Sequence, residues 1–162
     1  MRQKEKDMKR FATIAVLILA AAGAVGAGEQ PASEPYTPGF GEFMSATQVR
    51  HAKLWFAGDA RNWDLAVFEL DEIKEGLEDA TRLHPTHDGI PVGDMIKASL
   101  DEPLAGLAKA IEAKDKNEFT RAFDVLTEAC NGCHTAAAHA FIKIKRPTAP
   151  PVSNQDFAPA SK

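Results

Sequence analysis

The most reactive side chains of the sequence stand together in Cys130-Asn131-Gly132-Cys133-His134. Two thiols two residues apart, followed directly by an imidazole, suit three kinds of chemistry. A C-x-x-C pair can exchange with disulfides, Cys and His can bind zinc, and C-x-x-C-H can attach a haem covalently. The surrounding sequence has to decide among the three.

Zinc fits the composition poorly. A structural zinc site takes four Cys or His ligands, and Cys130 and Cys133 are the only two cysteines of the chain. The neighbouring side chains of Cys133 and His134 do not turn easily toward one metal ion. The remaining histidines are scattered, at His51, His84, His87 and His139.

A redox dithiol fits poorly as well. Such a pair normally opens a helix beside a βαβ unit, where the helix dipole lowers the thiol pKa. Here the motif follows several turns of predicted helix, and no strand pattern is present. A disulfide from Cys130 to Cys133 would close a tiny ring and stabilise little. The pattern favours one covalent haem c, bound through both sulfurs, with His134 on the iron.

The N-terminus agrees with haem attachment, which takes place outside the bacterial cytoplasm. A basic stretch precedes an uncharged apolar run over 11–27, and small residues close it. Residues 1–27 therefore predict a signal peptide and a periplasmic protein. The alternative is an uncleaved membrane anchor, because 17 residues lie at the lower edge of the length needed to span a bilayer.

Charge excludes one class of partner. Residues 1–27 hold five basic and two acidic residues, so their removal changes the net charge from −4 to −7. Nucleic-acid binding depends on clustered Lys and Arg, and this balance argues against it.

Apolar residues recur at helical spacing in four stretches. The first covers residues 39–58 and ends at Gly58, and the second begins near Asn62, a favourable N-cap residue. A loop with two prolines and two glycines follows over residues 83–94. The apolar stripe of the second stretch consists of Trp63, Val67, Leu70, Ile73 and Leu77.

The third stretch, over residues 94–115, contains Pro103, which predicts either a kink or a break between two helices. The fourth opens with a capping box formed by Asp115 and Glu118. Its apolar series includes Cys130 and Cys133, so we expect the motif on the buried face of the last helix.

Together these elements predict an all-α fold, an antiparallel up-down-up-down four-helix bundle with the haem at one end. We expect an extended lead-in over 28–38, the helical domain over 39–146 and a proline-rich tail over 147–162 without regular structure.

A single C-x-x-C-H in the last helix of an exported four-helix bundle resembles the class II cytochromes c, cytochrome c prime and its low-spin relatives. The resemblance covers residues 39–146, and only Cys130, Cys133 and His134 are specific to it. It implies an electron carrier, not an enzyme, that meets redox partner proteins and in some members forms homodimers. Ala137 and Ala138 stand where cytochrome c prime has an aromatic and a basic residue, which argues against gas binding of that type.

The residue on the other side of the iron decides the function. The resemblance implies Met44, which precedes the Gly at the end of the first helix by fourteen residues. His51 is the alternative, although a lone helix histidine beside Arg50 and Lys53 more often faces solvent. We expect Phe40, Trp55, Phe123 and Leu126, with Phe119, to pack around the haem.

Two other functions stay open. An empty sixth position would make a five-coordinate haem protein that binds or senses NO or CO. Without haem, the chain would be a helical interaction module with a redox-active C-x-x-C.

Overall fold

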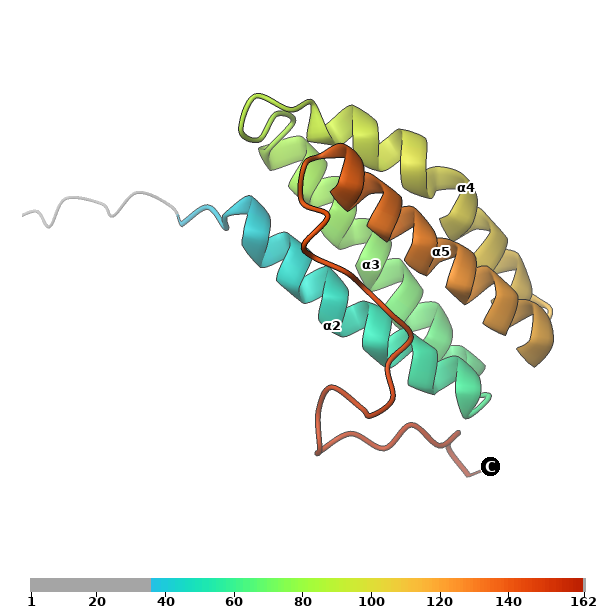
Figure 1. Cartoon of the computed structure of the whole chain (residues 1–162). Helices are drawn as coiled ribbons and strands as arrows, with labels where there is room; N and C mark the ends of the chain where they lie inside the picture. The colour runs from blue at the N-terminus through green and yellow to red at the C-terminus, as the bar shows by residue number, and fades with distance from the viewer. Residues whose placement is uncertain (1–35, 162) are drawn as a thin grey trace, which may run out of the picture. The chain divides into compact units, whose positions relative to one another are not determined.

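The computed structural model describes residues 36–161. The predicted signal peptide, and residues 28–35 of the predicted lead-in, lie outside this part. The described residues form four helices, α2 (Phe40–Asp59), α3 (Trp63–Leu83), α4 (Val92–Glu112) and α5 (Lys116–Ala136), and no strand (Figure 1). The predicted all-α fold is confirmed.

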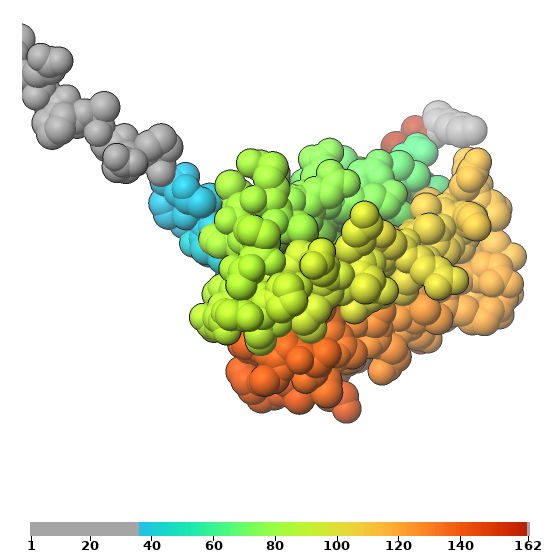
Figure 2. All heavy atoms as spheres, turned by 90° about the horizontal axis from the view of Figure 1, so that it is seen from above, coloured from blue at the N-terminus to red at the C-terminus, as the bar shows by residue number. Residues whose placement is uncertain are grey.

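The helices form a four-helix bundle. Each packs against the next along the chain, and contacts between α2 and α5 close the bundle. Figure 2 shows α4 lying between α3 and α5 on one face. Three residues connect α2 to α3 and three connect α4 to α5, so these packed neighbours must run in opposite directions. Antiparallel order brings the start of α2, the loop after α3, the start of α4 and the end of α5 to one end.

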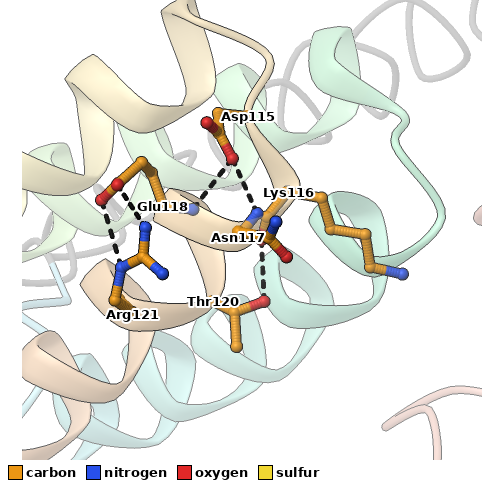
Figure 3. Close-up of polar contacts among 6 residues, drawn as sticks. All are labelled: Asp115, Lys116, Asn117, Glu118, Thr120 and Arg121. Carbon is orange, nitrogen blue, oxygen red and sulfur yellow. Dashed lines mark hydrogen bonds and ion pairs between the residues drawn. The ribbon is translucent and has the colours of Figure 1, made fainter.

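Side-chain caps fix where α3 and α5 begin. The Asn62 side chain accepts a hydrogen bond from the Leu65 backbone N–H at 3.2 Å, as predicted. Asp115 accepts from the N–H groups of the second and third residues after it, at 2.8 and 3.0 Å (Figure 3). The predicted capping box is only half formed, because the Glu118 carboxylate pairs with Arg121, one turn ahead, instead of the Asp115 N–H.

Two details of the predicted helices are settled. Pro103 lies within one continuous helix, α4, so it does not divide the stretch. Val67 is 48 % exposed and does not belong to the buried stripe of α3, where Leu70, Ile73 and Leu77 are buried. The stripe prediction was wrong at that position because Ala66, one residue earlier, fills the interior instead.

The core is apolar and centred on two aromatic residues of α5, Phe119 and Phe123, which are fully buried. One charged group joins it. The Glu69 carboxylate on α3 is 1 % exposed and meets Arg50 at 3.1 Å and Lys53 at 3.9 Å, both on α2. Within residues 36–161 no helix is both long and apolar enough to cross a membrane.

The C-terminal tail has no regular structure, as its prolines predict, yet it packs against the bundle. It runs back from α5 toward the end where α2 stops (Figure 1). Arg146 pairs with Asp124 on α5, and its guanidinium lies 4.4 Å from the ring centroid of Trp55 on α2. Phe157 is buried with its ring 5.6 Å from that of Phe56.

Candidate functional site

The Cys130–His134 motif occupies the last two turns of α5, close to the helix C-terminus. A thiol at a helix N-terminus is activated by the helix dipole, and neither cysteine is placed there. The same end of the bundle carries the start of α2 and the loop between α3 and α4. Helix α5, which carries the motif, packs against α4 and α2.

Both cysteines are free thiols and half-buried. Cys130 packs against the hydrophobic core. Burial raises the pKa of its thiol to about 11, and the nearby Cys133 adds to the rise. Burial also raises the pKa of Cys133, partly offset by a hydrogen bond with the Ser99 side chain of α4. Both sulfurs are thus protonated at neutral pH and poor nucleophiles for disulfide exchange.

His134 is held by the chain that follows it. Helix α5 ends at Ala136, and the backbone turns back at Ala138, whose φ of 60° lies in the left-handed region. The His134 Nδ1 then lies 3.0 Å from the backbone carbonyl of Ile142. A carbonyl only accepts, so Nδ1 carries the proton and donates. The Nε2 atom takes no part in this hydrogen bond.

The contacts between α2 and α5 place Met44 relative to the motif. His51 contacts Phe123 and Thr127, while Trp55, four residues later, contacts Phe123 and Phe119. Because α2 and α5 are antiparallel, a residue a given number of positions earlier in α2 lies level with a residue the same number of positions later in α5. Met44 precedes His51 by seven residues, which places it level with Gly132, between the two cysteines. It is half-buried and packs against the core, as Cys130 does.

His51 is buried, contrary to the expectation for a histidine between two cationic residues. It is 4 % exposed, its ring centroid lies 4.3 Å from that of Phe123, and its Nε2 lies 2.9 Å from the Thr127 hydroxyl. That hydroxyl is 2.9 Å from the Phe123 carbonyl, to which it donates. Burial lowers the pKa of His51 to about 4, so its ring is neutral.

The five aromatic and aliphatic residues expected around a haem all belong to or pack against the hydrophobic core, but they are spread along the bundle. Leu126 is buried on α5 one turn before Cys130. Phe40, at the motif end, stacks on His87 with ring centroids 4.8 Å apart. Trp55 and Phe123 belong to an aromatic cluster around Phe119 that extends toward the opposite end of the bundle.

Two histidines in the loop after α3 also reach the motif end. The Nε2 of His84 lies 2.8 Å from the Pro38 carbonyl and donates to it, because a carbonyl can only accept. Its ring meets Phe40 and Phe43 at 6.2 and 6.1 Å. No local feature of the sequence predicts these contacts, which join residues more than 40 positions apart. No group of three or more Cys, His, Asp or Glu side chains within residues 36–161 is arranged to hold a metal ion.

A groove of about 870 Å³ runs between α3 and α4. Leu77, Ile96, Leu100 and Leu104 form its apolar part, and charged residues such as Lys74 and Glu112 border it. None of the motif residues lines this groove, so it is separate from the candidate site.

The end of the bundle thus offers two thiols, one imidazole whose Nδ1 is hydrogen-bonded to the Ile142 carbonyl, and one thioether at the level of the thiols. The chain was compared with protein-family models, with curated proteins and with solved structures, and none of the three comparisons finds a match.

Proposed function

We propose that the protein is an exported c-type monohaem cytochrome that carries single electrons. The sulfurs of Cys130 and Cys133 form thioether bonds to one haem, and His134 ligates the iron. The similarity to the class II cytochromes c agrees with this proposal, because the motif stands in the last helix of a four-helix bundle. The proposed location is the periplasm and the proposed partners are redox proteins, with a homodimer as one assembly.

The observation that carries the proposal is the orientation of His134. Histidines that bind metals almost always donate their other ring N–H to a carbonyl, a carboxylate or water. The Nδ1 of His134 has such a carbonyl, that of Ile142, at 3.0 Å. Its Nε2 is thereby left for the iron, in the position directly after the second cysteine that C-x-x-C-H requires.

The chemistry of the thiols supports haem attachment over the redox dithiol. Exchange with a disulfide needs a thiolate, and burial keeps the pKa of Cys130 at about 11. A haem, when bound, supplies the one-electron couple of its iron. The protein supplies the covalent attachment, the axial ligand and an apolar surrounding.

Met44 is the proposed sixth ligand and His51 the alternative. Register places Met44 level with the cysteines, whereas His51 lies about 10 Å further along α2 and its Nε2 is engaged with Thr127. A thioether in this position favours outer-sphere electron transfer and raises the reduction potential relative to histidine.

Expression with a cytochrome c maturation system tests the proposal. We expect haem that stays bound after denaturation, and its loss when Cys130 and Cys133 are both replaced by Ala. We expect a low-spin ferric spectrum with the near-infrared sulfur-to-iron band. Met44→Ala should abolish that band, while Met95→Ala, at the half-buried start of α4, should leave it unchanged.

Other results point elsewhere. A chain that retains no covalent haem would refute the proposal. A high-spin ferrous spectrum that shifts on adding CO would assign an open site for gases. High-spin haem in His51→Ala, with no sulfur band in the parent protein, would assign His51 in place of Met44.

A further inference from the structure

We propose that Asn131, the first residue between the two cysteines, is a positioning residue for the iron ligand His134. Its side chain holds the returning chain so that the Ile142 carbonyl faces the imidazole. The inference rests on the proposed function, because the electronic effect on the iron exists only when haem is bound.

The hydrogen bonds around Asn131 form a closed arrangement. Its Nδ2 donates to the Ile144 carbonyl at 2.9 Å, and its Oδ1 accepts from the Ile144 N–H at 2.8 Å. One side-chain amide thus satisfies both backbone polar groups of Ile144, as a neighbouring strand would. Ile142, two residues earlier, is thereby set at the distance at which its carbonyl accepts from His134, 3.0 Å.

No regular secondary structure holds the segment that follows α5, residues 137–144, in place. It contains no helix or strand after Ala136, and its turn passes through the left-handed conformation of Ala138. The backbone of His139 donates to the His134 carbonyl at 2.7 Å, and Ile142 donates to the His139 carbonyl at 2.9 Å. These two bonds close the turn, and the Asn131 side chain holds Ile144, beyond the turn, against α5.

The residue type matters. Asparagine carries one acceptor and one donor group in a planar amide, which matches a peptide unit. A carboxylate could accept from the Ile144 N–H but could not donate to its carbonyl. An aliphatic side chain could do neither, so Ile144 would lose both of its hydrogen bonds to α5 and the Ile142 carbonyl would be held less firmly beside His134.

The expected consequence is electronic. A hydrogen bond from Nδ1–H to a carbonyl makes the imidazole a stronger donor and fixes its orientation. A stronger donor stabilises the ferric state more than the ferrous state. Loss of the bond should therefore raise the reduction potential.

The experiment compares holoproteins that retain covalent haem. In Asn131→Leu we expect the ferrous state to be favoured about tenfold more than in the parent, a rise of about 59 mV for a one-electron couple. Asn131→Asp should give a smaller rise. The control is Asn117→Ala, an exposed asparagine at the other end of α5, which should leave the potential unchanged.

Hydrogen exchange of the Ile144 amide is the second measurement. We expect the Ile144 amide to be protected in the parent and in Asn131→Asp, and to lose its protection in Asn131→Leu. If Asn131→Leu does not acquire haem, the reduction potential of Asn131→Asp alone decides whether the inference holds. An unchanged potential in both Asn131 variants, or an unprotected Ile144 amide in the parent, would overturn the inference. Either result would leave the proposed cytochrome intact, whereas absence of covalent haem in the parent would overturn the proposed function itself.

Discussion

At the scale of single residues, the pair His51 and Thr127 shows how one hydrogen bond joins two helices. The Thr127 hydroxyl has one proton, which it donates to the Phe123 carbonyl. It can therefore only accept from His51, whose Nε2 must carry the ring proton. The bond links α2 to α5 one turn before the motif and contributes to the register that sets Met44 level with the cysteines.

This geometry predicts a pH dependence of stability. The pKa of His51 falls from 6.5 to about 4 through burial. Between these two values the unfolded chain binds a proton that the folded chain does not, so stability is full above pH 6.5 and declines as the pH falls toward 4. The loss amounts to roughly 3 kcal/mol.

Urea unfolding between pH 7 and pH 4, on the chain expressed without haem attachment, measures this loss. His51→Gln keeps a side chain able to donate to Thr127 but has no titrating group. We expect its stability to decline less over this range. Equal declines in the parent and the variant would show that His51 is not buried in its neutral form.

At the scale of elements, the contact between the last turn of α2 and the first turn of α5 has no spare room. A Cβ added to Gly58 would lie 2.1 Å from the ring of Phe119, which is fully buried. Phe119 cannot withdraw, because Trp55 and Trp63 lie 6.2 and 6.0 Å from its ring. Close packing of these helices therefore requires glycine at position 58.

Gly58→Ala should destabilise the protein by about 1–3 kcal/mol, the usual cost of overpacking, despite the better helix propensity of alanine. Gly106→Ala is the matched control. Gly106 lies inside α4 with no atom within 4 Å of an added Cβ, so this variant should gain up to about 1 kcal/mol. Chemical unfolding measures both, and a neutral Gly58→Ala would contradict the packing described.

The elements themselves could be predicted because their signals are local. Helical spacing of apolar residues, and caps at Asn62 and Asp115, act over three or four residues. The motif too could be read directly from the sequence. The contact of His51 with Thr127 joins residues 76 positions apart, and neither residue carries a local mark of it. The two hydrogen bonds between Asn131 and Ile144 were not predicted either, because these residues lie 13 positions apart and carry no local sign of the contact.

At the scale of the whole molecule, the C-terminal tail extends the packed structure beyond the helices. The prolines correctly predicted the lack of helix or strand, but irregular backbone does not imply an unpacked one. Phe157 is buried against Phe56 of α2, and the Asn62 side chain donates to the Ala158 carbonyl at 3.0 Å. The chain after α5 thus begins beside the motif, and the tail fixes it at the opposite end.

Two phenylalanines of the C-terminal region test whether a ring contributes to stability because it is buried or only because it is hydrophobic. Phe157→Ala removes a ring that is 9 % exposed and should cost about 3 kcal/mol, at the lower end of the range for buried aromatic residues. Phe141→Ala removes a ring that is 80 % exposed and should change stability by no more than about 0.5 kcal/mol. Urea unfolding followed by tryptophan fluorescence measures both, because Trp55 lies under the tail at Arg146. Equal effects of the two substitutions would mean that the tail does not pack on the bundle, while a large cost for Phe157 alone would make the tail a structural part of the folded protein.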